Sequence, residues 1–173
     1  SVDTSMGMTP LEGLVMGTRS GDIDPAVLLH LQRIGAFDAP GLDHLLNRSS
    51  GLLGLGGHSD MRDLLADPSA AAKLAVDVYV HRLQHYIGAY AAELGGLDAL
   101  VFTAGVGENS NVIRARAVEG LGFLGLELDA ALNDERSDGA RVISTGSVPV
   151  LVVPTNEELQ IARETVEVVT GRK

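Results

Sequence analysis

The spacing of apolar residues changes from helical to strand-like near residue 99, and this change predicts the order of the main elements. Between residues 76 and 94, apolar side chains recur every three or four positions, which predicts a long helix with one buried stripe. The pair Asp67-Pro68 opens that helix and Gly95-Gly96 ends it. Residues 99–103 and 150–153 are continuously apolar instead, which predicts strands, the second of them covered on both faces.

Caps and turns predict the elements of the first half of the chain. The pair Asp24-Pro25 predicts a helix that stops at Gly35, and a short helix is expected from residue 40 to 47. Residues 2–8 alternate weakly and predict a strand, followed by a helix start at residues 9–12. Four glycines and three leucines at residues 51–57 predict an apolar turn rather than a helix.

The second half of the chain alternates strands with helices. We expect a helix from about residue 110 to 119, a hairpin-like pair at 141–144 and 148–153, and a terminal helix whose packed face holds Leu159, Ala162, Val166 and Val169. This order predicts an α/β fold with a mainly parallel or mixed sheet and helices on its faces. Ligands of such sheets bind beyond the carboxyl ends of the strands, where residues 105–109 and 155–158 converge on one edge.

Composition and charge narrow the classes of partner. The 173 residues are 45% hydrophobic and 21% charged, which is ordinary for one compact domain. A net charge of −10, with no local Lys/Arg cluster, argues against a nucleic-acid or anionic-membrane surface. The absence of cysteine excludes disulfides and thiolate zinc sites and suits the cytoplasm. The first residues lack the features of a signal peptide and read like the middle of a strand, so we expect a fragment of a longer protein.

Residues 99–109 read as a buried strand, a tight turn and a helix start. Gly105 and Gly107 leave the backbone bare, and a helix start presents N–H groups, a geometry that nucleotides exploit. Many α/β proteins turn on Gly-x-Gly for packing alone, so the pattern leaves both interpretations open.

A second candidate is the pair of carboxylates at residues 157–158. Thr155 and Glu158 fit a capping box, which leaves Glu157 available for Mg²⁺, directly or through water. The alternative is that both acidic residues are there because the helix dipole favours them.

Two further groups carry arginines. Arg19 lies between Gly17 and Gly21, where its planar fork is able to reach a phosphate or carboxylate; the alternative is an ordinary surface arginine. Asp60 and Arg62 lie at a predicted helix start. There the Asp60 carboxylate is suited to accept a hydrogen bond from a ribose hydroxyl, and the Arg62 guanidinium is suited to lie along a base or phosphate. Capping with a local ion pair explains them equally well.

Histidines and tyrosines add little chemistry. His81 and His85 are one helical turn apart, a spacing that suits a metal, but no acidic third ligand is evident nearby. Tyr79, Tyr86 and Tyr90 fall on the same long helix, which favours a core or subunit-interface role.

Three segments together resemble the acetate kinase family. Residues 4–25 resemble its second signature, residues 101–110 its nucleotide-pocket motif and residues 154–165 its C-terminal motif, in matching order and spacing. The resemblance implies a ribonuclease H-like domain of the acetate and sugar kinase, Hsc70 and actin superfamily, in which two domains close over ATP. It covers only the C-terminal half of such an enzyme, so residues 1–173 are expected to be its C-terminal nucleotide-binding domain, incomplete at its N-terminal edge.

Site residues carry over by motif. Arg19 is similar to the arginine that stabilises the transferring phosphoryl group, and Glu157 to the magnesium-binding glutamate, for Mg²⁺ or Mn²⁺. The adenosine-binding tripeptide, which often has an aromatic residue in the middle, corresponds to Asp60, Met61 and Arg62. The nucleotide loop corresponds to Gly105, Val106, Gly107, Glu108 and Asn109.

The resemblance implies a cytoplasmic homodimer that reversibly transfers the γ-phosphoryl group of ATP to acetate, giving acetyl phosphate and ADP. Two alternatives stay open: a propionate or butyrate kinase of the same family, and a nucleotide-gated interaction or dimerisation domain. The family's acyl pocket, catalytic Asp and phosphate loop have no counterpart in these residues, so the chain alone is expected to be inactive.

Overall fold

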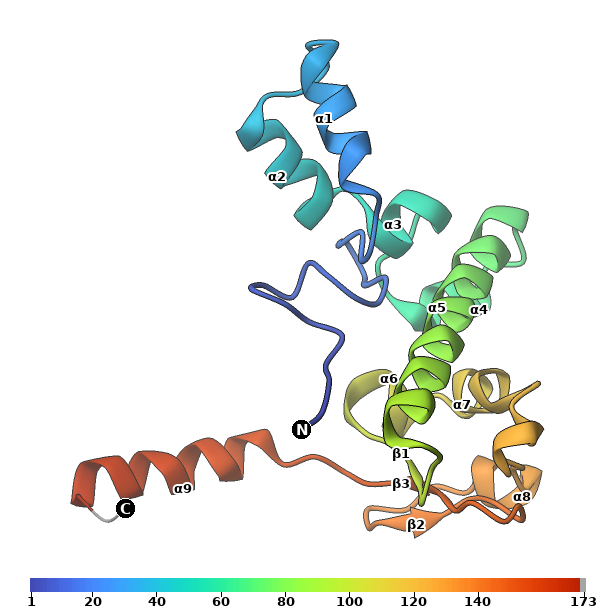
Figure 1. Cartoon of the computed structure of the whole chain (residues 1–173). Coiled ribbons are helices and arrows are strands. Elements are labelled where there is room, and N and C mark those ends of the chain that lie inside the picture. Colours follow the sequence, from blue (N-terminus) through green and yellow to red (C-terminus); the bar gives the residue numbers. More distant parts are fainter. Residues whose placement is uncertain (172–173) are drawn as a thin grey trace. The chain divides into compact units, whose positions relative to one another are not determined.

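The computed structural model describes residues 1–171 and divides the chain into two compact units, Ser1–Leu97 and Asp98–Lys173. Figure 1 labels the α-helices and strands of both units. The first unit contains helices α1 (Pro25–Arg33), α2 (Ala39–Arg48), α3 (Gly51–Gly56), α4 (Met61–Ala66) and α5 (Ala70–Leu94). The second contains β1 (Leu100–Phe102), α6 (Ala104–Asn109), α7 (Asn111–Val118), the 3-10 turn η1 (Gly122–Leu124), α8 (Ala130–Asp134), β2 (Arg141–Val142), β3 (Val150–Val152) and α9 (Glu157–Thr170).

Helix α5 is the framework of the first unit and confirms the helical spacing of its sequence. Its buried stripe includes Val76, Val80 and Ile87, and helices α3 and α4 contact it. The helix begins two residues after the predicted Asp67-Pro68 pair, because Ser69 is the N-cap and accepts a hydrogen bond from Ala72 N–H. Gly95, in the left-handed conformation, ends it as predicted.

The prediction of a turn at residues 51–57 is wrong, because these residues form helix α3. Its first N–H groups have carbonyl partners in a distant loop: Leu52 N–H donates to Met16 O and Leu53 N–H to Gly17 O, both at 2.9 Å. A side chain at Gly56 would lie only 2.5 Å from Leu64 Cδ2, so glycine allows α3 to pack closely on its neighbours. These tertiary contacts outweigh the poor helix propensity of glycine.

The predicted strand at residues 2–8 and the helix start at 9–12 are also wrong, since residues 1–12 form bends and turns. Val2 and Met8 are exposed, so the weak alternation buries no face. The next two helices are confirmed as α1 and α2. Asp24 caps the first through Ala26 N–H, and Asp38 caps the second through Gly41 N–H.

A three-stranded mixed sheet forms the centre of the second unit, with the order β1-β3-β2. β1 and β3 are parallel, with Leu100 opposite Val150 and Phe102 opposite Val152. β2 pairs antiparallel with β3. The predicted hairpin and the mixed sheet are therefore confirmed.

Only one face of this sheet is buried within the described residues. Phe102, Val150 and Val152 share that face. Val101 and Val142 are about half exposed, and Leu151 lies between them on the opposite face. The prediction that residues 150–153 are covered on both faces is thus only half right.

Helix α9 differs from its predicted role in two ways. Leu159, Val166 and Val169 are exposed rather than packed, and α9 has no buried residue. Its N-cap is Asn156, which accepts from Leu159 N–H at 3.0 Å, so the predicted capping box on Thr155 does not form. Over residues 1–171, no helix has the length and apolarity to cross a membrane.

Replacing Gly51 by alanine is expected to destabilise the protein by about 2 kcal/mol or more. Gly51 has φ +65°, and an added Cβ would press on Met16 O and lie 2.6 Å from Arg19 O. Gly35→Ala is the matched control, because Gly35 has φ +70° but nothing within 4 Å of the added atom. The free energy of unfolding of this control variant should fall by only about 1 kcal/mol. Urea unfolding measures both, and equal losses would contradict a steric role for Gly51.

Candidate functional site

The loop that carries Arg19 is attached to its surroundings on both sides of that residue. Thr18 Oγ1 donates to Asn47 O at 2.8 Å, and Ser20 N–H donates to Leu46 O at 3.0 Å. Arg19 itself is partly buried and contacts Met16 Sδ at 3.7 Å. No carboxylate forms an ion pair with Arg19 in the part of the chain that the structure describes. A guanidinium on an anchored loop, without a carboxylate partner, is suited to bind an anion.

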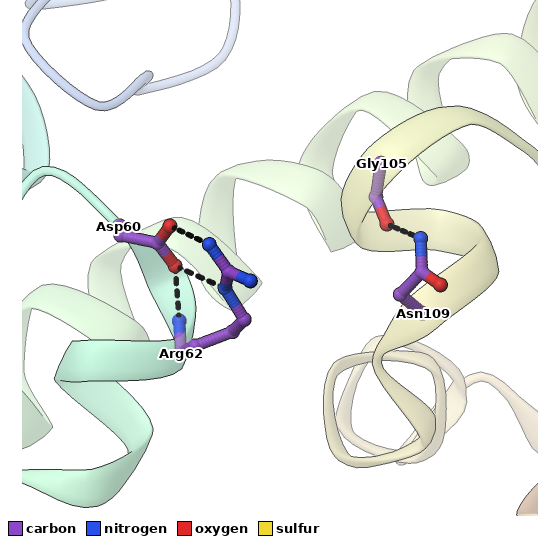
Figure 2. Close-up of polar contacts among 4 residues, drawn as sticks. All are labelled: Asp60, Arg62, Gly105 and Asn109. Carbon is purple, nitrogen blue, oxygen red and sulfur yellow. Dashed lines mark hydrogen bonds and ion pairs between the residues drawn. The ribbon is translucent and has the colours of Figure 1, made fainter.

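Asp60 and Arg62 form both a helix cap and an ion pair, as the sequence allowed. Asp60 is the N-cap of α4 and accepts from Arg62 N–H at 2.8 Å. The Arg62 guanidinium donates to both carboxylate oxygens, from Nε at 3.0 Å and from Nη2 at 2.6 Å (Figure 2). These hydrogen bonds lower the pKa of Asp60 to about 2. The Arg62 side chain is 88% exposed and so remains accessible to a ligand.

Met61, between them, has a different environment. Its side chain is buried in the core of the first unit. Only Asp60 and Arg62 of the predicted adenosine-binding tripeptide therefore present side chains at the surface.

The Arg19 loop and the Asp60 turn are neighbours within the first unit. A Cβ placed on Gly17 would lie 2.7 Å from the carbonyl oxygen of Ser59, the residue before Asp60. The two backbones approach this closely only because residue 17 is glycine. Two groups that the sequence predicted separately thus lie side by side.

In the second unit, the two glycines of the predicted nucleotide loop have different roles. A Cβ on Gly105 would meet nothing within 4 Å, so this part of the backbone faces open space. A Cβ on Gly107 would contact Phe102 at 3.4 to 3.6 Å, which identifies Gly107 as a packing position against β1. Val106 and Asn109 complete this segment, which forms helix α6 rather than the predicted turn, and Asn109 Nδ2 donates back to Gly105 O at 2.8 Å (Figure 2).

Glu108 joins the two strand-to-helix junctions. Its Oε1 accepts from Ala104 N–H at 2.7 Å and from both the N–H and the hydroxyl of Thr155 at 2.9 Å. Hydrogen bonds from Thr155 and then Ala104 lower the pKa of Glu108, although partial desolvation opposes them. The predicted convergence of residues 105–109 and 155–158 on one edge is therefore confirmed. Thr155, predicted as a cap, serves this junction instead.

Backbone strain also marks this junction. Ala104 has φ +57° and is the only non-glycine residue with positive φ among residues 1–171. Holding alanine there costs about 1 kcal/mol. Such strain persists where neighbouring contacts enforce it, and here the hydrogen bond from Ala104 N–H to Glu108 does so.

Arg114 is a site-supporting residue that sequence reasoning missed. Its side chain is 2% exposed, and its Nη1 donates to Gly107 O at 2.9 Å and Glu108 O at 2.8 Å. Its Nε and Nη2 donate to the side chain and backbone of Asn133. Burial lowers the pKa of Arg114, with Arg141 adding to the effect. The sequence offered one signal for this role: Arg114 is next to Ile113 and three residues before Ala117, so it falls on the face of α7 that is buried.

Glu157 lies in the first turn of α9 and is exposed. Within residues 1–171 its carboxylate makes no hydrogen bond or ion pair. In the same described residues, no three His, Cys, Asp or Glu side chains form a metal-binding group, and His81 and His85 are no exception. Mg²⁺ keeps several water ligands and is held by one or two carboxylates together with substrate phosphates. A single unpaired carboxylate fits that manner of binding and does not fit a metal held by the protein alone.

Comparison with known proteins places this geometry in a family. Residues 1–163 match the family model described as the Acetokinase family. The chain is 63% identical over 176 residues to the acetate kinase of Leifsonia xyli subsp. xyli, covering 99% of this chain and 44% of the relative. It is 57% identical over 174 residues to the acetate kinase of Streptomyces coelicolor, and this match covers 98% of this chain and 43% of the relative.

Solved structures agree with these sequences. Porphyromonas gingivalis acetate kinase superposes with a TM-score of 0.87 at 44% identity, covering 95% of this chain and 43% of that one. A propionate kinase from Francisella tularensis superposes with a TM-score of 0.86 at 42% sequence identity. The match covers 94% of this chain and 42% of that kinase. The chain belongs to the acetokinase family and spans less than half the length of the relatives it matches. The α/β fold class implied by the resemblance is thereby confirmed, as that of an acetate or propionate kinase domain.

Arg62→Ala is expected to raise the pKa of Asp60 from about 2 toward 3.8, because the guanidinium supplies most of the hydrogen bonds that lower it. The ion pair favours the ionised carboxylate. Its contribution to stability is therefore present above the unfolded pKa and is lost as the pH falls toward 2. A carboxyl NMR titration measures the shift, with Asp67 as the internal control. An unchanged Asp60 pKa in the variant would contradict the assignment.

Proposed function

We propose that the complete protein catalyses the reversible, magnesium-dependent transfer of the γ-phosphoryl group of ATP to acetate, giving acetyl phosphate and ADP. Residues 1–173 are then its C-terminal nucleotide-binding domain, and a second domain supplies the acyl site. The observation that carries this proposal is the 63% identity to an acetate kinase along 99% of the chain. The arrangement of charged side chains within each unit supports it.

Arg19 and Glu157 are proposed for the reacting phosphoryl group. In-line phosphoryl transfer spreads charge over the equatorial oxygens, so it depends on positioned cations more than on covalent help from the protein. Arg19 has no carboxylate partner among the described residues, and its loop is anchored on both sides. Glu157 offers a carboxylate for Mg²⁺ or Mn²⁺, which when bound neutralises charge on the phosphate oxygens.

Candidate nucleotide contacts are proposed in each unit separately. In the first unit, Asp60 is suited to accept from a ribose hydroxyl, and the exposed Arg62 is suited to a base or phosphate. In the second unit, the bare backbone at Gly105 leaves room for close approach of the nucleotide. Glu108 is proposed to shape this loop rather than to contact the nucleotide, because its Oε1 already accepts three hydrogen bonds.

A propionate kinase is the second candidate, because the Francisella tularensis propionate kinase matches this chain almost as well as acetate kinase structures do. The acyl pocket that would separate acetate, propionate and butyrate has no counterpart that we recognise in these residues. The complete protein is also proposed to be a cytoplasmic homodimer. The alternative from another class is a domain that binds nucleotide only to gate an interaction or dimerisation.

A hydroxamate assay of the full-length protein, with ATP, Mg²⁺ and each of acetate, propionate and butyrate, tests the proposal. We expect the highest kcat/KM with acetate, as the named relatives imply. A preference for propionate or butyrate would select the alternative within the family. Nucleotide binding without any acyl phosphate would favour the gated interaction domain.

Glu157→Ala in the full-length protein is expected to lower kcat at least about tenfold and raise the Mg²⁺ concentration needed for half-maximal rate, because the variant removes a metal-binding carboxylate. Glu158→Ala is the matched control, since it removes the same charge from the same helical turn. Magnesium titrations of both variants make the measurement. Near-normal turnover and magnesium dependence in Glu157→Ala would remove the assignment.

A further inference from the structure

Asp22 closes the base of the loop that carries Arg19. Its backbone N–H donates to Gly13 O at 3.0 Å, and its Oδ1 accepts from Gly13 N–H at 2.8 Å. Both polar backbone groups of Gly13 are thus bound by one residue. A Cβ on Gly21 would lie 2.6 Å from Gly13 O, so the two sides of the base are in close contact. Residues 13–22 therefore form a closed loop with Arg19 near its end.

The second oxygen of Asp22 attaches this base to helix α5. Asp22 Oδ2 accepts from Arg82 Nη2 and from the Tyr86 hydroxyl, the latter at 2.6 Å. Arg82 and Tyr86 lie one turn apart on α5, and the Arg82 guanidinium is 5.7 Å from the Tyr86 ring centroid. The side chains of Asp22 and Arg82 are 30% and 27% exposed. We call Asp22, Arg82 and Tyr86 the loop anchor.

The charge states of Asp22 and Tyr86 do not change near neutral pH. Burial by itself raises the pKa of Asp22, but hydrogen bonds from Tyr86, Gly13 and Arg82 outweigh it and leave the pKa below its usual value. The hydrogen bond to Asp22 raises the pKa of Tyr86 to about 12. Asp22 is thus an anion and Tyr86 a neutral donor throughout.

Both oxygens of Asp22 are occupied by partners within the protein, which argues against a direct contact with substrate. The loop anchor instead restrains the base of the loop, while helix α3 restrains its other side through Met16 O and Gly17 O. Between these two attachments the backbone at Arg19 has little freedom to shift. Transition-state stabilisation needs a cation held to within about 0.5 Å, so such restraint affects rate more than binding.

We propose that Asp22, supported by Arg82 and Tyr86, is a positioning residue that holds the Arg19 guanidinium in its catalytic place. This inference rests on the role of Arg19 in the proposed function. None of the three anchor residues touches the reacting atoms; they act through the loop. Their effect should consequently depend on the presence of Arg19.

A double-mutant cycle in the full-length protein tests this dependence. Arg19→Ala alone is expected to lower kcat on the order of a hundredfold. Asp22→Asn keeps the shape of the side chain but removes the charge, and should lower kcat roughly tenfold with the KM for ATP nearly unchanged. In the Arg19→Ala background, Asp22→Asn should cause almost no further loss of kcat. Tyr86→Phe should lower kcat by a smaller factor, and this loss should likewise disappear in the Arg19→Ala background.

Tyr90→Phe is the control, because the Tyr90 ring lies tilted beside that of Tyr86, with 5.7 Å between the ring centroids, but is not part of the loop anchor. It should retain normal kcat. If Asp22→Asn does not fold, Tyr86→Phe decides by the same criterion.

Two results would overturn the inference, and they differ. If Asp22→Asn lowers kcat by the same factor with and without Arg19, the loop anchor acts independently of that arginine, while the proposed function stands. If Arg19→Ala has normal kcat, the catalytic role of Arg19 fails together with the inference. Absence of acyl phosphate formation by the unmodified protein would reject the proposed function itself.

Discussion

Buried backbone polar groups need hydrogen-bond partners, and the glycine-rich loops of this protein find theirs in other segments. The carbonyls of Met16 and Gly17 accept from the start of α3. The carbonyls of Gly107 and Glu108 accept from the buried Arg114. The loop at residues 13–22 has no helix or strand of its own, and residues 104–109 form only the short helix α6, so these hydrogen bonds help to hold both segments in place. Arg19 lies in the first segment, and residues 105–109 of the candidate nucleotide site lie in the second.

The arginines of this protein divide into those that bind other protein groups and those that remain available to a ligand. The chain carries a net charge of −10, which would repel an anionic substrate if charge were evenly spread. Arg114 and Arg82 are used inside the protein, on carbonyls and on a carboxylate respectively. Arg19 has no carboxylate partner among residues 1–171, and Arg62 shares one at the surface. An acidic protein is thus able to present cations at chosen positions.

Local patterns were enough where a segment satisfies its own backbone. The long stripe of α5 and the Asp caps of α1 and α4 were predictable, because a helix forms its hydrogen bonds within its own segment and the spacing of its apolar residues follows from burial of one side. The continuously apolar residues of β3 also predicted a strand, although its hydrogen-bond partners are β1 and β2. Prediction failed at residues 51–57 because the groups that cap and pack α3 come from positions 16, 17 and 64. It also failed for Thr155, whose partner Glu108 lies 47 residues away.

Family membership, the order of most elements and the residue types available for chemistry could be predicted from the amino-acid sequence, since these depend on composition and on short motifs. How those residues are used depends on the folded structure. It assigned Gly105 to open space and Gly107 to packing, and it engaged Glu108 in a junction. It also recruited Asp22 and Arg114 as supports. These roles could not be predicted, because a hydrogen bond or a close contact between residues far apart in the sequence depends on their distance in space, which no local pattern contains.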